Sequence, residues 1–138
     1  MNAAVEALAT AYGEAWNGHD VEAITALHTD DMAMEAAATG DIFAGDDLRA
    51  FLESYFKTWP DISFDSRRVF ITPELIVNEW TATATHSQPV PRGERSSTPD
   101  GSTITWTGID VLPVRDGKIE RKIVYANSLG LFDQLGLL

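Results

Sequence analysis

The sequence contains no cysteine, few basic residues and no long apolar run. Without cysteine the chain has no disulfide, no thiolate metal ligand and no cysteine nucleophile. Only 10 lysines and arginines stand against 21 acidic residues, so the formal net charge is −11. A surface of this sign repels phosphate backbones and anionic membranes, and we therefore expect neither nucleic acid nor membrane as a partner.

The apolar runs are also shorter than the roughly 20 residues that a membrane-spanning helix needs. The first ten residues, MNAAVEALAT, lack the basic segment of a signal peptide. We therefore expect a cytoplasmic protein. The chain has 138 residues, which predicts a single domain over residues 1–138. A domain of this length buries roughly 70% of the surface that its unfolded chain exposes, which leaves room for a modest cavity.

Hydrophobic periodicity predicts helices first and a run of strands afterwards. Apolar residues spaced three or four apart predict helices near residues 5–16, 21–27 and 48–56, with a short strand at 31–38. Alternating patterns then predict four strands, at 62–72, 75–86, 102–115 and 118–127. Asp116-Gly117 is a strong hairpin turn between the last two. Helices segregated from an antiparallel meander are typical of an α+β domain, and a twisted sheet that curls around helices leaves an interior.

Five segments carry a resemblance that spans nearly the whole chain. In order they are AWNGHD, FAGDDLRAFLESYFKTWPDISF, VNEWTATATH, TWTGIDVLPVRDGKIERKIVYAN and QLGLL. Together they resemble the SnoaL-like polyketide cyclases of the nuclear transport factor 2-like superfamily. The resemblance implies a conical, cystatin-like barrel, with three N-terminal helices packed on a curved, mainly antiparallel sheet around one apolar pocket. It also implies acid–base chemistry by an aspartate on a small hydrophobic carbonyl compound, with no metal and no organic cofactor.

The last strand departs from that family. The family commonly has Tyr-x-Asp there, whereas this chain has Tyr125-Ala126-Asn127. An amide cannot take a proton near neutral pH, although it can hydrogen-bond a carbonyl or an oxyanion. Because alternation puts Tyr125 and Asn127 on one face, we consider both as substrate-binding candidates. The alternative interpretation of Asn127 is an amide that caps the end of the strand.

Two titratable residues in the middle strands are the candidates for catalysis. Asp110 interrupts the apolar stretch TWTGIDVLPV, and a carboxylate in such surroundings needs partners or changes its pKa. His86 ends a strand, and if it lies beside Asp110 the two residues form a proton-transfer pair. The alternatives are an aspartate on the solvated face and a histidine that bonds to the backbone at the strand edge.

The remaining candidates are apolar and aromatic. Tyr12 and Trp16 lie on the core stripe of the first helix, where they either pack the core or line a pocket. Met34 is a candidate for adaptable lining, while Trp80 and Trp106 lie on the strand faces that also carry His86 and Asp110. The three histidines have no metal-ligand spacing, so no metal site is predicted.

Two functions from different classes remain open. One is a cofactor-independent cyclase or isomerase, in which the polar stretch 87–101 forms a flap that excludes water. The other is a non-catalytic module that binds a small hydrophobic or aromatic molecule or serves for dimerisation. A homodimer is plausible for either function, through an outer sheet face that carries Thr81, Thr83, Thr85, Ile109 and Val111.

Overall fold

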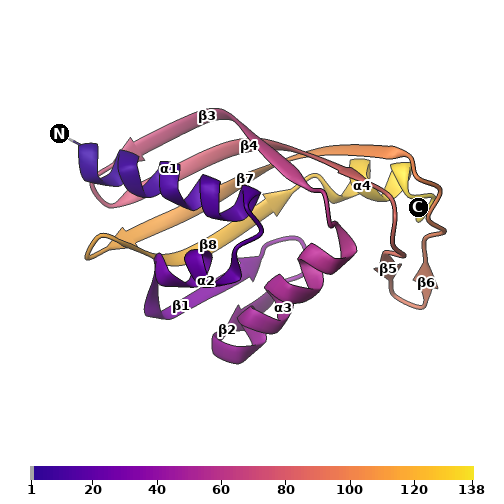
Figure 1. Cartoon of the computed structure of the whole chain (residues 1–138), viewed down its shortest axis with the longest axis horizontal. Coiled ribbons are helices and arrows are strands. Elements are labelled where there is room, and N and C mark those ends of the chain that lie inside the picture. Colours follow the sequence, from indigo (N-terminus) through magenta and orange to yellow (C-terminus); the bar gives the residue numbers. More distant parts are fainter. Residues whose placement is uncertain (1) are drawn as a thin grey trace.

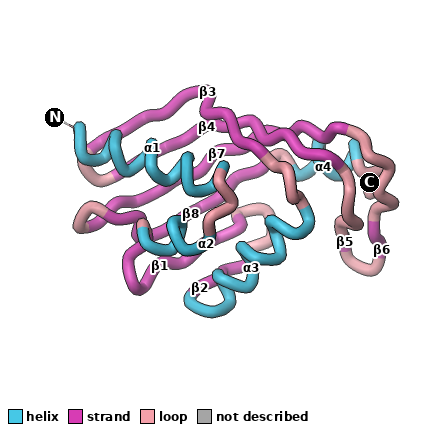
Figure 2. Tube along the Cα trace, in the orientation of Figure 1, coloured by secondary structure: helices cyan, strands magenta, loops and turns pink. Residues whose placement is uncertain are grey.

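One curved sheet of six strands forms the body of the molecule, with α1, α2 and α3 on one of its sides (Figures 1 and 2). The computed structural model describes residues 2–138. The helices are α1 (Ala3–Asn17), α2 (Val21–Ala26), α3 (Gly45–Thr58) and α4 (Ser128–Gln134). The sheet strands are β1 (His28–Ala36), β2 (Asp41–Ala44), β3 (Ser63–Thr72), β4 (Leu75–Thr85), β7 (Thr103–Arg115) and β8 (Lys118–Ala126). A separate small hairpin is made of β5 (Pro91–Arg92) and β6 (Arg95–Ser96).

The strand order is β2-β1-β8-β7-β4-β3, and neighbouring strands are antiparallel except for β1 and β8, which run parallel. The predicted α+β fold with a curved, mainly antiparallel sheet is therefore confirmed. Among residues 2–138 no pairing joins the edge strands β2 and β3, so the sheet stays open and does not close into a barrel. Within the same residues, no helix has the length and apolarity required to cross a membrane.

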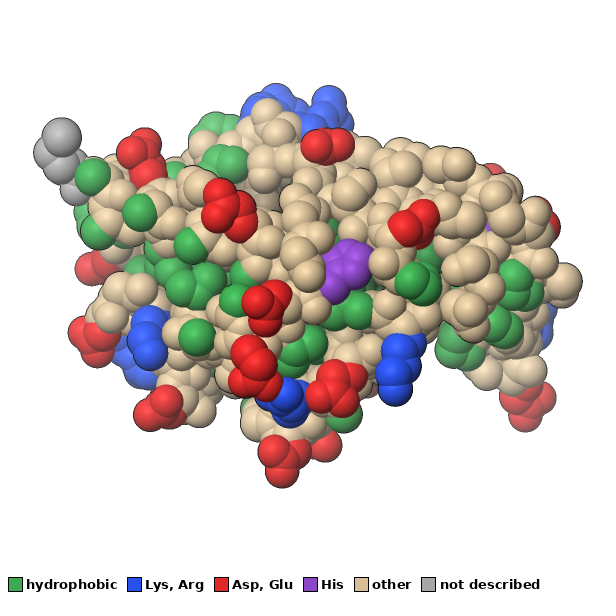
Figure 3. Space-filling view, viewed as in Figure 1, with side chains coloured by type: hydrophobic (Ala, Val, Ile, Leu, Met, Phe, Trp, Pro, Cys, Tyr) green, Lys and Arg blue, Asp and Glu red, His purple; other side chains and the backbone are tan. Residues whose placement is uncertain are grey.

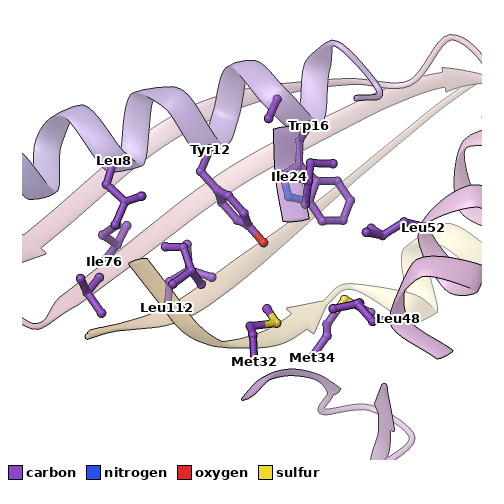
Figure 4. Packing of buried hydrophobic residues seen from close by; sticks show 13 residues of the cluster. Leu8, Tyr12, Trp16, Ile24, Met32, Met34, Leu48, Leu52, Ile76 and Leu112 are labelled. Carbon is purple, nitrogen blue, oxygen red and sulfur yellow. The ribbon is translucent and has the colours of Figure 1, made fainter. Parts of the chain in front are cut away.

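The buried apolar residues form two clusters. In the first, Leu8, Tyr12 and Trp16 of α1 project towards Ile76, Leu112 and the two methionines of β1 (Figure 4). The second contains Trp59, Trp80, Trp106, Leu135 and Leu137, and it lies towards α4 and the C-terminus. The helical stripe of α1 therefore packs on the inner face of the sheet, as the sequence spacing predicts.

The stretch 87–101 differs from the flap that the sequence suggests. Arg92 and Arg95 of its small hairpin donate hydrogen bonds to the backbone carbonyls of Leu137 and Gly136. Arg92 also lies over the ring of Phe132, with its Cζ 4.7 Å from the ring centroid. The stretch is therefore fastened to the C-terminal residues. None of residues 87–101, all of which the structure describes, lines the large cavity described below.

Candidate functional site

A cavity of about 660 Å³ lies between α1 and the inner face of the sheet. This volume is within the range of pockets that hold small organic ligands. The inward-pointing residues of β4, β7 and β8 form its floor, because side chains two apart in a strand share a face. Aromatic side chains form much of its wall: Tyr12, Trp16, Phe51, Tyr55, Trp59, Phe64, Trp80 and Trp106.

The cavity reaches the surface between α1 and β3. Its solvent-exposed lining residues are Glu6, Thr10, Gly13 and Asn17 of α1 and Ser66 and Val69 of β3. Asn17 fixes one end of this opening, since its amide donates to the carbonyl of Phe64 (3.0 Å) and accepts from the amide of Phe64 (2.7 Å). Figure 3 shows that acidic side chains are spread over the face of the molecule that carries α1 and α3.

A buried ion pair lies in this largely apolar cavity. Lys122 Nζ is 3.0 Å from Asp110 Oδ2, and each residue is only 6% exposed. The two strands bring them together because Asp110 faces Val124 across the β7–β8 pair, which makes Lys122 its diagonal neighbour on the same face. The ammonium also lies 4.1 Å from the centroid of the Trp16 ring, a cation–π contact.

The two oxygens of the Asp110 carboxylate differ in their hydrogen bonds. Asp110 Oδ1 is buried and accepts no hydrogen bond from residues 2–138. A buried carboxylate oxygen without a donor is costly in a protein interior. Asp110 lines the cavity, although this oxygen has less than 1 Å² of accessible surface. The ion pair thus holds the carboxylate by one oxygen and leaves the other without a partner among residues 2–138.

Tyr12 and His28 form a second polar pair beside the first. The Tyr12 hydroxyl and His28 Nε2 share a hydrogen bond of 2.8 Å. Burial, together with the positive charge of Lys122, lowers the pKa of His28 to about 4. Burial, together with the negative charge of Asp110, raises the pKa of Tyr12 above its ordinary range. At neutral pH the pair therefore consists of an uncharged imidazole and a protonated phenol, which can donate a hydrogen bond.

The structure places six of the nine predicted site residues around this cavity: Tyr12, Trp16, Met34, Trp80, Trp106 and Asp110. Asp110 faces inward, so the alternative of an aspartate on the solvated face is wrong. Trp80 reaches the cavity by passing over Gly108 of β7, where any side chain would collide with the indole ring. The catalytic and substrate-binding roles of these residues remain predictions.

Tyr125 and Asn127 lie elsewhere. Lys122, Val124 and Ala126 of β8 point into the cavity, so Tyr125 points outward and is 56% exposed. Asn127 lies outside the cavity lining, and its Oδ1 accepts a hydrogen bond from the amide of Gly130 (3.0 Å), which caps α4. The capping interpretation of this amide is therefore the correct one, although the element that it caps is a helix that begins there.

His86 is not beside Asp110. Asn78 is the residue opposite Asp110 across the β4–β7 pair, and His86 lies eight residues further along, roughly 26 Å at the rise of a strand. His86 is buried outside the cavity lining, where Nε2 and Ser97 Oγ share a hydrogen bond of 2.7 Å. Its Nδ1 lies 3.5 Å from Asp100, so the histidine fastens the stretch 87–101.

The two polar residues that flank Asp110 in the cavity were missed by the sequence analysis. Lys122 lies on the face of β8 opposite Tyr125, so taking Tyr125 as a cavity residue left Lys122 out. Asn78 lines the cavity next to Asp110, but its position depends on the register between β4 and β7, which no local pattern gives. Among residues 2–138 no cluster of three histidine, aspartate or glutamate side chains is suited to hold a metal ion.

Comparison with known families identifies the chain. The sequence profile described as SnoaL-like polyketide cyclase matches residues 6–135. The chain belongs to the SnoaL-like polyketide cyclase family. A search of functionally curated proteins gives no match for this SnoaL-like chain.

Solved structures agree with this family at the level of the fold. The SnoaL-like chain is similar to IdmH from Streptomyces antibioticus, a proposed polyketide cyclase, with a TM-score of 0.79 and 20% identity over 95% of this chain and 97% of IdmH. It is similar to TsrD from Streptomyces laurentii, with a TM-score of 0.81 and 22% identity over 100% and 98%. It is also similar to AclR from Streptomyces galilaeus, a proposed hydroxylase, with a TM-score of 0.81 and 22% identity over 96% and 85%. Because one fold carries different reactions, the reaction has to be argued from the cavity.

Proposed function

We propose that this SnoaL-like protein is a cofactor-independent cyclase or isomerase that removes a proton next to the carbonyl group of a flat hydrophobic molecule. The observation that supports this most is Asp110, a buried carboxylate that lines the cavity and whose Oδ1 has no partner among residues 2–138. A base that is positioned within hydrogen-bond reach of a substrate contributes about 10²–10⁴-fold to a rate. The wall of aromatic rings suits a flat substrate.

The proposed chemistry needs only the residues of the cavity. Asp110 Oδ1 takes a proton from the carbon next to the carbonyl, and the electron pair of the broken C–H bond moves onto the carbonyl oxygen to give an enolate. With His28 in the tautomer whose Nε2–H donates to the Tyr12 oxygen, the Tyr12 hydroxyl keeps its proton for this oxygen, and the ammonium of Lys122 balances the charge. The enolate carbon then either attacks a second carbonyl of the substrate, which closes a ring, or takes a proton at another carbon. In both cases Asp110 returns its proton to the product.

Proton exchange with solvent is the direct test. We choose 2-tetralone, a flat bicyclic ketone, and expect the wild-type protein to speed the exchange of its α-protons for deuterium, measured by NMR above the buffer rate. Asp110→Asn should lower the enzymatic rate at least 10²-fold, because an amide is no base. Asp133→Asn, an exposed carboxylate on α4, is the matched control and should exchange at the wild-type rate.

The folding of the variant is controlled separately. Asp110→Asn leaves the buried Lys122 without its partner, which destabilises by about 3–5 kcal/mol. The double variant Asp110→Asn/Lys122→Met removes both charges and should remain folded without activity. Undiminished exchange in either folded variant contradicts the role of Asp110.

A non-catalytic binding module is the second candidate function. It is favoured by Asn127, which stands where the family commonly has an aspartate and lies outside the cavity. Tight binding of 2-tetralone, measured by isothermal calorimetry, together with exchange at the buffer rate would support this second function and contradict the first.

A further inference from the structure

Two tryptophans on the cavity floor each face a small residue on the neighbouring strand. Trp80 of β4 lies directly opposite Gly108 of β7, and Trp106 of β7 lies directly opposite Ala82 of β4. Side chains that face each other across an antiparallel pair have Cβ atoms about 4.5–5.5 Å apart, so a small residue at one position leaves room for the ring at the other.

The contact between Trp80 and Gly108 is closer than any side chain at position 108 would allow. A Cβ atom there would lie 2.3 Å from Cζ2 and 2.5 Å from Cη2 of the Trp80 indole, whereas ordinary contacts begin at 3.4 Å. Phe64 of β3 packs edge-on against the same indole, with the ring centroids 5.5 Å apart and an angle of 90° between the planes. The backbone of Gly108 and the ring of Phe64 therefore fix the position of the indole.

This indole lies where the cavity ends. Gly108 and Asp110 are two residues apart on the inner face of β7, so Trp80 is one row further along the sheet than the carboxylate. Of the second apolar cluster, Trp59, Trp80 and Trp106 line the cavity. Other described members of that cluster do not line it, among them Ala84, Ile104, Leu135 and Leu137. The tryptophans therefore separate the cavity from a filled apolar region near α4.

We propose that Trp80, placed by Gly108, is the end wall of the cavity and selects ligands by the length that they extend from Asp110 towards α4. Gly108 is then a positioning residue, because it acts through the indole for which it leaves room. A ligand that is one fused ring too long overlaps the indole or forces it off its position, and such overpacking of a fixed wall is unfavourable. This inference rests on the proposed function only for the place of the ligand, and it is measured without turnover.

The test compares two flat ketones that differ in one linearly fused ring, 2-acetylnaphthalene and 2-acetylanthracene. By fluorescence titration the wild-type protein should bind the shorter ketone about tenfold more tightly. Trp80→Leu removes most of the wall, so the preference should fall below about twofold. Trp80→Phe, which keeps an aromatic ring in a smaller side chain, should lower the preference in the same direction. Phe51→Leu, on the α3 side of the cavity, is the control and should keep the full preference.

Gly108→Ala tests the positioning role. The added methyl group pushes the indole into the cavity, so this variant should bind 2-acetylnaphthalene about tenfold more weakly than the wild-type protein does. In Gly108→Ala/Trp80→Leu the methyl group has room, so the affinity for this ketone should return to that of Trp80→Leu.

Three results overturn the end wall: equal binding or no binding of the two ketones by the wild-type protein, a preference that survives in either folded Trp80 variant, and unchanged binding by Gly108→Ala. None of them decides the proposed function, which depends on the α-proton exchange of 2-tetralone and on Asp110→Asn. Absence of that exchange, with the length preference intact, contradicts the proposed function and leaves the end wall standing.

Discussion

Lys122 Nζ lies 3.0 Å from Asp110 Oδ2 in a cavity whose walls are otherwise mostly aromatic and aliphatic. Each charge has lost most of its contact with water and depends on the other for compensation. We predict that Lys122→Met destabilises the protein by about 3–5 kcal/mol, because it leaves the Asp110 carboxylate buried and unpaired. Replacing both residues, as in Asp110→Asn/Lys122→Met, should recover most of this loss.

Urea denaturation at pH 7 measures the coupling between the two residues. The sum of the two single losses should exceed the loss of the double variant by at least about 1 kcal/mol. Additive losses would contradict the view that the two charges stabilise each other.

His28 makes stability depend on pH. Its pKa is about 4 in the folded protein against 6.5 in the reference state, so the unfolded chain binds a proton at a higher pH than the folded chain does. The titration of His28 therefore leaves the free energy of unfolding unchanged above pH 6.5 and lowers it as the pH drops from 6.5 to 4. The whole loss is on the order of 3 kcal/mol.

A variant without a titrating group isolates this contribution. His28→Gln keeps a polar partner for Tyr12 and should lose less stability between pH 7 and pH 4 in denaturant titrations. Equal losses in both proteins would show that His28 does not cause the dependence.

Asn127 lies at the start of α4 and not in the cavity, which predicts how its variants behave. Asn127→Asp restores the family residue and keeps a good N-cap, so stability should change by less than about 0.5 kcal/mol and the α-proton exchange rate of 2-tetralone should stay within about twofold. Asn127→Ala removes the cap and should cost about 1 kcal/mol. A large gain of exchange activity in Asn127→Asp would contradict the position outside the site.

The outer face of the sheet carries an apolar row that suits a second copy of the chain. Strand register aligns Phe70, Val77, Val111 and Ile123 across β3, β4, β7 and β8, with Ile109 and Tyr125 beside them. Phe70 is 59% exposed and Tyr125 56%, and an exposed band of this kind is typical of an interface.

We expect the homodimer suggested by the sequence to use this row. Sedimentation equilibrium should give twice the 15.1 kDa of the chain, and Phe70→Asp should give the monomer. Leu129→Asp, at an apolar position on α4 that is even more exposed than Phe70, is the control and should remain dimeric. A wild-type monomer at about 100 μM, a concentration at which even weak specific pairs form, would contradict the pairing.

Local patterns predicted the elements of this fold closely. The strands predicted at 62–72 and 118–127 are observed as Ser63–Thr72 and Lys118–Ala126, because period-2 alternation and the Asp116-Gly117 turn act over a few residues. The helix α4 was not predicted as an element of its own, since the short apolar tail that forms it has no clear helical period. The parallel pairing of β1 with β8 was also outside the prediction, because it joins segments distant in sequence.

The site was predictable only in part for the same reason. Alternation predicted that Tyr125 and Asn127 share a strand face, but β8 ends at Ala126 and Asn127 begins α4. Alternation also does not say which face of β8 is the inner one. The pairing of Asp110 with Lys122, and the distance that separates Asp110 from His86, depend on strand register, which is decided by the packing of the whole sheet. An aspartate in an apolar strand was therefore enough to single out Asp110 as the catalytic candidate. Its neighbours in the cavity could be identified only from the structure.

A crystal structure of the protein with 2-tetralone tests the central claim most directly. We predict that the ketone lies between α1 and the sheet, with an α-carbon about 3–3.5 Å from Asp110 Oδ1 and its oxygen directed towards Tyr12. A ketone that binds on the outer face of the sheet, or in the cavity with both α-carbons turned away from Asp110, would contradict the account.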